Sequence, residues 1–450
     1  MDHVKRQKHG AFFIDGPGGT GKTFLYNALY AEIRLMNKIV LPTATSGIAA
    51  ANIPSGRTAH SRFKISLDPL ESLACNVPKQ GSLAALLRET TLIIWDEASM
   101  AKKENVESLD VLLRDICNPE LLFGGKIVVF GGDFRQVLPV VPKRTQREAV
   151  AASLVSSVLW PLLIKFRLTE NIRARQDPTY AAFLLALGNG QLQNSENALV
   201  QLPPAIVQPY DAAVGQDMQL KSVAFPEMDM PPFDANIFTT RAILTPINDD
   251  VDIINEILIA KFPGEVVAYK SYDSMIDDNC SIYPTEFLNK LCPGGMSPHE
   301  LLLKVNSPVI LLRNILPSSG LCNGTRLICK KFFPNLIECV IAVGHHKGEH
   351  VLIQRINLRP SESSAYPFQF QRKQFPLKLS FAMTINKAQG KTLNKVVVYL
   401  PRSCFSHVQL YVALSRAREA ANVSVITDVD ADRLDLNVVS YDILCMAGII

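Results

Sequence analysis

An α/β fold with two domains of parallel strands flanked by helices is the architecture that the sequence predicts. Apolar runs that end in glycine or polar residues alternate with amphipathic helical segments, which is typical of buried parallel strands. A phosphate-binding pattern follows the first of these strands. Short β-rich runs between about 303 and 360 interrupt the second alternation. We expect those runs to form a small barrel-like module within the second domain.

The first domain is expected over residues 1–165. Its strands are "AFFIDG", "KIVLPTAT", "TLIIWDEAS" and "KIVVFGGD", and each ends where a functional loop would lie. The segment "TFLYNALYAEIRLM" has the spacing of an amphipathic helix. Its predicted buried face consists of Phe24, Leu25, Ala28, Leu29, Ile33 and Met36.

The remaining chain continues this plan with one irregular stretch. Residues 201–236 contain six prolines and show no periodicity, which indicates a surface insertion or linker. We expect a connecting segment over 166–200 and the second α/β domain in two parts, 237–302 and 361–450, around the 303–360 insertion.

Composition limits the classes of protein that remain. The 450 residues are 48% hydrophobic and 20% charged, which is enough material for several packed cores. A net charge of +4 permits a nucleic-acid partner without arguing for one. The sequence contains no apolar run of about 18 residues, and its basic start leads straight into the phosphate-binding pattern, so we expect neither a membrane span nor a signal peptide.

One group of cysteine and histidine residues is a candidate for a metal site. The nine cysteines include no C-x-x-C pair, which favours a reducing compartment. Cys339, His345, His346 and His350 lie near one another in the sequence, but their spacing fits no standard zinc finger. We therefore do not predict a zinc site.

The stretch "GPGGTGKT" fits the pattern G-x-x-x-x-G-K-[ST] between a strand and a helix. Its glycines let the backbone wrap a phosphate, and the helix amino terminus adds partial positive charge. Lys22 is expected to reach the β- and γ-phosphates of ATP, and the Thr23 hydroxyl to hold Mg²⁺. The predicted nucleotide-binding residues are Gly16, Pro17, Gly18, Gly19, Thr20, Gly21, Lys22 and Thr23.

Two further strand ends offer catalytic side chains. In "IIWDEAS", Asp96 is suited to Mg²⁺ and Glu97 to orienting an attacking water, with a solvated acidic turn as the alternative. In "VVFGGDFRQ", Gln136 follows a glycine turn and is placed to sense the γ-phosphate.

Two arginines are candidates for stabilising the charge that spreads over the γ-phosphate during transfer. Arg173 lies in "LTENIRAR" and Arg416 in "YVALSRAR". An isolated surface cation is the alternative for either. The second pattern falls on a predicted helix of the second α/β domain, so Arg416 would complete the site from there.

Taken in order, the motifs "GPGGTGKT", "PTATSGIAA", "TAHS", "IIWDEASM", "GGDFRQVLPVV", "LTENIR", "FAMTINKAQGKTL" and "QLYVALSRAR" resemble the PIF (petite integration frequency) family of superfamily-one ATP-dependent DNA helicases. "LCNGTRLI" is similar to the Helitron-like branch in particular. The resemblance implies two RecA-like P-loop NTPase domains with a small β-barrel-like insertion in the second. It implies an ATP- and Mg²⁺-dependent motor that moves 5′→3′ on single-stranded DNA and unwinds duplexes and forks.

The same resemblance implies a biological setting and a path for DNA. Roles in repair, recombination, telomere maintenance or Helitron-type transposition, a nuclear location and a monomeric state are implied. Phosphate contacts that position a strand without reading its sequence suit hydroxyl and basic side chains. The matching positions are Thr45, Thr58, His60, Thr384 and Lys387.

Three departures from the family pattern leave alternatives open. The adenine-contacting segment with its glutamine is expected to precede the first residue, Val408 stands where glycine is usual, and Ala388 replaces a serine. These changes put base selectivity and coupling in question. A decayed helicase fragment that binds DNA without unwinding it, and a nucleotide-gated switch that does not translocate, are the rival hypotheses.

Overall fold

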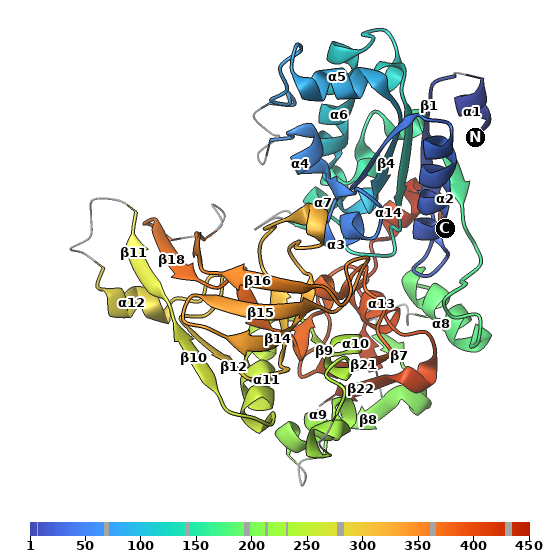
Figure 1. Ribbon diagram of the computed structural model, residues 1–450. Coiled ribbons are helices and arrows are strands. Elements are labelled where there is room, and N and C mark those ends of the chain that lie inside the picture. Colours follow the sequence, from blue (N-terminus) through green and yellow to red (C-terminus); the bar gives the residue numbers. More distant parts are fainter. Residues whose placement is uncertain are drawn as a thin grey trace. The chain divides into compact units, whose positions relative to one another are not determined.

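The computed structural model describes residues 1–6, 8–66, 72–139, 145–192, 199–211, 215–230, 233–276, 283–360, 366–427 and 434–450. The chain divides into two compact units. Unit 1 comprises Met1–Leu202, Cys404–Ala420 and Leu434–Ile450, and unit 2 comprises Pro203–Ser403 and Ala421–Arg433. Each unit contains a parallel sheet flanked by helices, as the sequence predicts (Figure 1).

The sheet of unit 1 has six strands in the order β3-β2-β4-β5-β1-β6, and all neighbouring strands run parallel. Parallel strands end at one common edge, so the loops after β1, β4 and β5 are brought together there. The strands are β1 (Gly10–Asp15), β2 (Ile39–Ala44), β3 (Arg57–Thr58), β4 (Thr90–Asp96), β5 (Ile127–Gly132) and β6 (Ile164–Arg167).

Helices cover both faces of this sheet, with α2 (Lys22–Leu35) on one side and α5 (Ser82–Glu89) and α6 (Lys103–Ile116) on the other (Figure 1). Along β4, Ile94 packs with α2 while Trp95 packs with α6, which is the alternation expected of a strand buried on both faces. The other helices and strands of unit 1 are α1 (Asp2–Lys5), α3 (Gly47–Ala51), α4 (Ala59–Phe63), α7 (Gln146–Ala152), α8 (Pro178–Gly188), β7 (Leu199–Gln201), α13 (Gln409–Leu414), β23 (Leu434–Leu436) and α14 (Tyr441–Met446).

The predicted buried face of α2 is wrong at its start. Phe24 is 79% exposed, whereas Tyr26 and Ile33 are fully buried against the sheet. The helix begins at Lys22, directly after the phosphate loop, and this fixes its rotation so that Tyr26 rather than Phe24 points to the strands.

Helix α13 groups with unit 1, although the sequence places it between two strands of the second sheet. It packs on α8, where the Tyr180 hydroxyl donates a hydrogen bond to the Leu414 carbonyl over 2.9 Å. Contacts of this kind assign Cys404–Ala420 to unit 1, whereas the sequence prediction placed all of 361–450 in the second domain.

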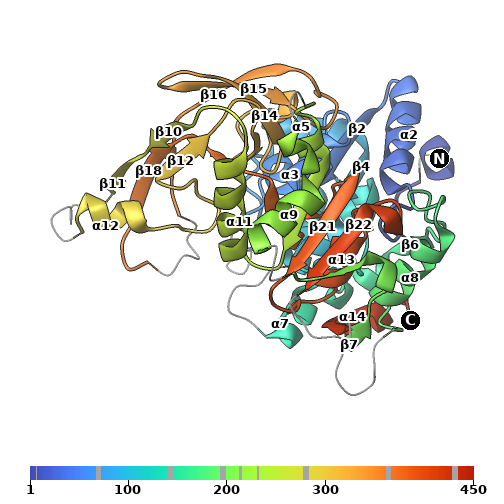
Figure 2. The ribbon, with the colours of Figure 1, turned by 90° about the horizontal axis from the view of Figure 1, so that it is seen from below.

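The sheet of unit 2 is also parallel, with the order β20-β9-β21-β22-β8. Figure 2 shows α9 (Gln216–Ala224) and α11 (Asn248–Lys261) beside it, and both helices contact β9. The structure differs here from the predicted 201–236 linker, because that segment supplies the edge strand β8 and helix α9. The strands are β8 (Val207–Pro209), β9 (Arg241–Thr245), β20 (Ala382–Thr384), β21 (Lys395–Leu400) and β22 (Val423–Thr427).

A β-rich insertion is present in unit 2 and is longer than the predicted 303–360. Its largest sheet is antiparallel, in the order β16-β15-β14-β13-β19, and smaller sheets pair β10 with β12 and join β11, β18 and β17. Within the described residues this sheet has two edge strands, β16 and β19, so a barrel is not confirmed. The elements are β10 (Val267–Lys270), β11 (Tyr272–Met275), α12 (Thr285–Lys290), β12 (Glu300–Leu303), β13 (Pro308–Leu311), β14 (Arg326–Phe332), β15 (Leu336–Ile341), β16 (His350–Gln354), β17 (Ile356–Leu358), β18 (Phe370–Gln374) and β19 (Leu377–Leu379), with α10 (Ile237–Thr240) before β9.

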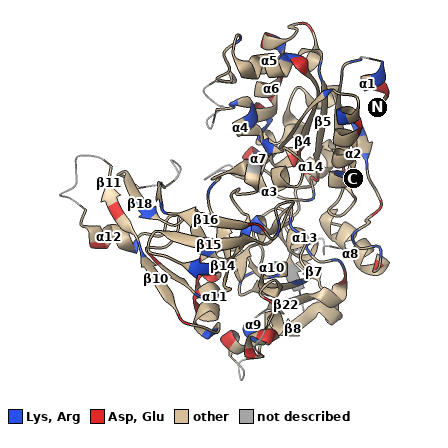
Figure 3. Cartoon of the chain, viewed as in Figure 1, with Lys and Arg blue, Asp and Glu red and all other residues tan. Residues whose placement is uncertain are grey.

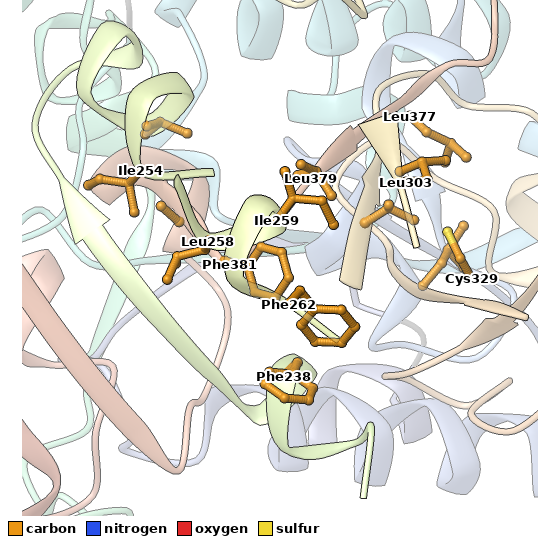
Figure 4. Close-up of a cluster of buried hydrophobic side chains, with 14 of the residues drawn as sticks. Phe238, Ile254, Leu258, Ile259, Phe262, Leu303, Cys329, Leu377, Leu379 and Phe381 are labelled. Carbon is orange, nitrogen blue, oxygen red and sulfur yellow. The ribbon is translucent and has the colours of Figure 1, made fainter. Parts of the chain in front are cut away.

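One hydrophobic core joins this insertion to the helices of unit 2 (Figure 4). Phe238 and Phe262 lie with their ring centroids 5.0 Å apart, and Leu303 and Leu377 from the insertion belong to the same buried cluster. The insertion is therefore packed as part of unit 2.

The sequence predicted neither a membrane-spanning helix nor a zinc site, and the described ranges of the chain bear on both. No helix in them is long and apolar enough to cross a membrane. No group of three or more His, Cys, Asp or Glu side chains in those ranges could hold a metal ion. Cys339 is buried in the core of unit 2, while His346 and His350 bond instead to Glu349 and Glu338.

Candidate functional site

The phosphate loop joins β1 to α2 and is shaped by its glycines. Gly19 and Gly21 have φ values of 93° and 87°, in the region that favours glycine. A Cβ at Gly16 would lie 2.5 Å from Thr20 Oγ1, and one at Gly19 would lie 2.5 Å from Asn171 Oδ1. Side chains are therefore excluded from both positions, and the backbone can wrap closely around a bound phosphate there.

Lys22 folds back over this loop from the first turn of α2. Its Nζ donates hydrogen bonds to the carbonyls of Gly16 and, over 3.4 Å, Pro17. The ammonium group thus lies where it would meet the phosphates of a nucleotide held by the loop. Thr23 follows on the same turn and is half-buried.

Asp96 and Glu97 form a buried acidic pair at the end of β4. Asp96 Oδ1 accepts a hydrogen bond from the Glu97 N–H over 2.9 Å. Burial, and then the charge of Glu97, raise the pKa of Asp96 to about 7, while Lys22 opposes the shift. Glu97 has φ 53°, a left-handed conformation that is uncommon outside glycine and is typical of functional loops. Two buried carboxyl groups with one nearby lysine favour a cation between them.

Gly131 in "FGGD" leaves room for the Tyr26 ring beside this acidic pair. A Cβ at Gly131 would lie only 1.6 Å from the Tyr26 hydroxyl oxygen, so only glycine leaves room for that ring. Asp96 and Glu97 add to burial in raising the pKa of Tyr26, which places its hydroxyl near the acidic pair.

Asp133, at the end of β5, connects Gln136 to the rest of the site. It is fully buried, and its Oδ2 accepts hydrogen bonds from Gln136 Nε2 at 3.0 Å and from the Tyr411 hydroxyl at 3.2 Å. The Tyr411 hydroxyl in turn accepts from the Gly18 N–H at 3.2 Å. Sequence reasoning singled out Gln136 but assigned no role to Asp133 or Tyr411, although both stand inside quoted motifs.

Both candidate arginines lie at the phosphate loop. Arg173 donates to the Ser415 carbonyl over 3.2 Å, and its own backbone N–H donates to Gly19. A Cβ at Gly18 would lie 3.6 Å from Arg416 Nη2. Burial, and then the charge of Arg416, lower the pKa of Arg173 to about 10. Burial also lowers the pKa of Arg416. Two cations held together in a buried site favour an anion between them.

The predicted DNA-contacting residues fall into both units. In unit 1 the Thr45 hydroxyl donates to the Glu97 carbonyl over 2.7 Å, so it is tied to the acidic pair. Thr58 and His60 are half-buried at the start of α4, and burial lowers the pKa of His60. In unit 2 Thr384 is buried and Lys387 is half-buried.

A phosphate loop at the end of a parallel sheet, with an acidic pair on a neighbouring strand, defines the fold of a P-loop nucleotide-binding protein. The family described as PIF1-like helicase matches residues 1–198, and the family described as the 2B domain of DNA helicase Pif1 matches residues 286–332. The chain belongs to the PIF1-like helicase family.

Curated relatives match most of this chain. It is 29% identical to the ATP-dependent DNA helicase PIF1 of Emericella nidulans over 93% of the chain, and 30% identical to that of Danio rerio over 92%. The chain spans 58% of the length of each of these two relatives. The ATP-dependent DNA helicase Pif1 of Campylobacter jejuni is 27% identical, with 90% of this chain and 86% of the relative covered.

Solved structures share the fold. Bacteroides Pif1 bound to single-stranded DNA superimposes with a TM-score of 0.70 at 22% identity, covering 100% of this chain and 95% of that one. Pif1 helicase from Candida albicans gives a TM-score of 0.67 at 24% identity, covering 98% and 95%.

Proposed function

We propose that this chain is an ATP-dependent DNA helicase that hydrolyses ATP to move along single-stranded DNA and separate duplexes. The observation that carries the proposal is that side chains from three distant segments meet the phosphate loop, which itself carries Lys22. Lys22, Gln136, Arg173 and Arg416 all lie at this loop within unit 1. A site that combines phosphate-binding amides with cations and a buried acidic pair suits phosphoryl transfer.

The residues present fit ATP and Mg²⁺. The loop from Gly16 to Thr23 would hold the phosphates, with Lys22 on the β- and γ-phosphates. Thr23 and Asp96 would hold Mg²⁺, because burial and the charge of Glu97 raise the pKa of Asp96 and a bound cation would offset that shift. Bound Mg²⁺ supplies charge neutralisation at the phosphates.

The remaining side chains would act on water and on the transferred group. Glu97 would orient the attacking water, and Gln136 would contact the γ-phosphate from its anchored position on Asp133. Arg173 and Arg416 would offset the negative charge that develops during transfer.

DNA is the proposed partner of this motor. Related proteins of this fold have been solved with single-stranded DNA and with forked DNA. Lys and Arg are interspersed with Asp and Glu along the chain (Figure 3), so we expect local contacts rather than one uniformly basic face. Thr45, Thr58, His60, Thr384 and Lys387 are the proposed contacts to the DNA backbone. Binding through phosphates should weaken steeply with salt and vary little with sequence.

Several finer parts of the proposal follow from family membership. We propose 5′→3′ movement, a nuclear location, the Helitron-like branch, and roles in repair, recombination, telomere maintenance or transposition. A monomer is the proposed active form, although a related structure describes two coordinating Pif1 helicases on a fork.

ATP turnover with and without single-stranded DNA is the test of this function. A motor should be stimulated strongly by DNA, and Lys22→Ala should remove the turnover. Unstimulated turnover would instead support a nucleotide switch, and DNA binding without turnover would support a decayed helicase. Unwinding only from a 3′ tail, and not from a 5′ tail, would refute the proposed direction.

A further inference from the structure

The hydroxyl of Tyr411 lies between the phosphate loop and a buried carboxylate. It accepts a hydrogen bond from the Gly18 N–H over 3.2 Å and donates one to Asp133 Oδ2 over 3.2 Å. A tyrosine hydroxyl has one proton to donate, and the Gly18 amide can only donate, so this assignment of donors is fixed. All three residues belong to unit 1, and Tyr411 is buried.

Asp133 shares the same oxygen between Tyr411 and Gln136. Gln136 Nε2 donates to Asp133 Oδ2 over 3.0 Å, while Arg135 Nη1 lies 3.4 Å from Oδ1 and balances the charge. Burial and the charge of Asp133 raise the pKa of Tyr411, so the hydroxyl keeps its proton. The Asp133 carboxylate therefore orients the Gln136 amide, and the same carboxylate oxygen accepts a hydrogen bond from Tyr411.

We propose that Tyr411 is a positioning residue that occupies the Gly18 N–H while the phosphate loop is empty and yields that N–H to an arriving nucleotide phosphate. The inference rests on the proposed function, because it assumes that a nucleotide enters this loop. Amides at the amino terminus of such a helix are the groups that bind phosphate, and an anionic oxygen is a stronger acceptor than a neutral hydroxyl. The hydroxyl keeps its bond to Asp133 during the exchange.

Through this exchange, phosphate binding at the loop would change the contacts of the segment that carries Arg416. Arg416 lies five residues beyond Tyr411, and its Nε donates to the Val412 carbonyl on the same helix over 2.8 Å. Loss of the Gly18 bond would remove one link between α13 and the loop, while the bonds of Tyr411 and Gln136 to Asp133 remain. Tyr411 would thus link phosphate binding to the placement of the arginine.

Replacing Tyr411 by phenylalanine removes only the hydroxyl. Nucleotide no longer has to displace it from Gly18, so ADP should bind a few-fold to about tenfold more tightly, the range that one neutral hydrogen bond supports. Asp133 also loses one of its donors, so Gln136 is oriented less well and kcat should fall. The signature of Tyr411→Phe is a lower KM for ATP together with a lower kcat.

Tyr180→Phe is the matched control. The Tyr180 hydroxyl is also buried and also bonds to α13, through the Leu414 carbonyl, but it has no bond to the phosphate loop. Its removal should lower the melting temperature about as much as Tyr411→Phe does, while the Kd for ADP and the KM for ATP stay within twofold of wild type.

Asp133→Asn separates the two halves of the proposal. If the asparagine nitrogen takes the place of Asp133 Oδ2, it cannot accept hydrogen bonds from Tyr411 and Gln136. Gln136 is then oriented less well, so kcat should fall. The Gly18–Tyr411 bond remains and only a nearby negative charge is lost, so ADP affinity should rise less in Asp133→Asn than in Tyr411→Phe. Tighter ADP binding in Asp133→Asn than in Tyr411→Phe would overturn the assignment of the exchange to the hydroxyl.

The experiment measures the Kd of a fluorescent ADP and the ATP kinetics of the full chain for wild type and the three variants. ADP binding that is tightest in Tyr411→Phe and unchanged in Tyr180→Phe, together with the lower kcat of Tyr411→Phe, supports the inference. Wild-type protein that binds and hydrolyses ATP while Tyr411→Phe behaves like Tyr180→Phe overturns the inference and leaves the proposed function standing. Wild-type protein that binds no nucleotide refutes the proposed function itself.

Discussion

The substitution Val408→Gly tests whether the backbone before α13 stores strain. Val408 has φ 45° and ψ 26°, the left-handed region in which a β-branched residue is an outlier. This conformation costs roughly 1–2 kcal/mol for a residue other than glycine. Surrounding structure maintains it, since the side chain is fully buried and the N–H donates to the Val438 carbonyl over 2.7 Å.

The magnitude follows from comparison with Val412, which is also fully buried but lies inside α13. Removing either side chain loses about 1.5–3 kcal/mol of burial. Glycine at Val408 recovers the roughly 1–2 kcal/mol of strain, whereas glycine in place of valine inside the helix adds a further cost of about 0.5 kcal/mol. The burial loss cancels in the difference, so Val412→Gly should be less stable than Val408→Gly by about 1.5–2.5 kcal/mol.

Urea unfolding of both variants and the wild type, followed by circular dichroism, measures this difference, provided that the m-values agree. Val408→Gly should lower the free energy of unfolding by about 1 kcal/mol, the burial loss less the recovered strain. Equal losses in the two variants, within about 0.5 kcal/mol, would refute the argument that the left-handed backbone is strained.

Three further outcomes are expected. Lys22→Ala should reduce ATP turnover by at least about 10²-fold because its ammonium is the group that folds over the loop; turnover near wild type in a folded variant would contradict this. Arg416→Ala should reduce turnover by about 10³-fold with only a modest effect on the Kd for ATP. Arg416→Lys should restore turnover poorly, because a point charge lacks the planar fork of the guanidinium. A loss of only a few-fold in Arg416→Ala would exclude a transition-state role. His407 should make the protein less stable in acid, because burial lowers its pKa from 6.5 to about 4. The contribution of the neutral form to the free energy of unfolding is complete above pH 6.5. About 3 kcal/mol of that free energy is lost as the pH falls toward 4. His407→Gln should flatten that slope in urea unfolding at several pH values, and an unchanged slope would assign the acid sensitivity to other groups.

Local patterns predicted the parts of the fold that depend on neighbours in the sequence. The apolar runs gave β1, β2, β4 and β5, because a strand buried on both faces needs only a continuous apolar stretch. The rotation of α2 was mispredicted, since periodicity alone allows Phe24 or Tyr26 to face the sheet. The edge strand β8 was missed because an edge tolerates prolines that a central strand does not.

The candidate site divides in the same way. Lys22 and Asp96 are recognisable from their spacing to a loop and a strand end. Asp133 and Tyr411 have functions that depend on a hydrogen bond between residues 278 positions apart, and no local pattern encodes that pairing. The positive φ of Val408 is likewise invisible in the sequence, where only the usual glycine of the family hints at it.

The covalent path of the chain connects the phosphate loop to unit 2. The segment Cys404–Ala420 contacts the loop through Tyr411, yet its ends continue directly into β21 and β22, strands of the unit 2 sheet. A phosphate that displaces Tyr411 from Gly18 acts on a short segment that is held at both ends by another sheet. β21 and β22 are paired over five residues of each strand, so the two ends of this segment are held beside each other in one sheet. The proposed exchange at Gly18 would therefore act on a segment whose two ends belong to the unit 2 sheet, and Tyr411 is the residue through which that segment contacts the loop.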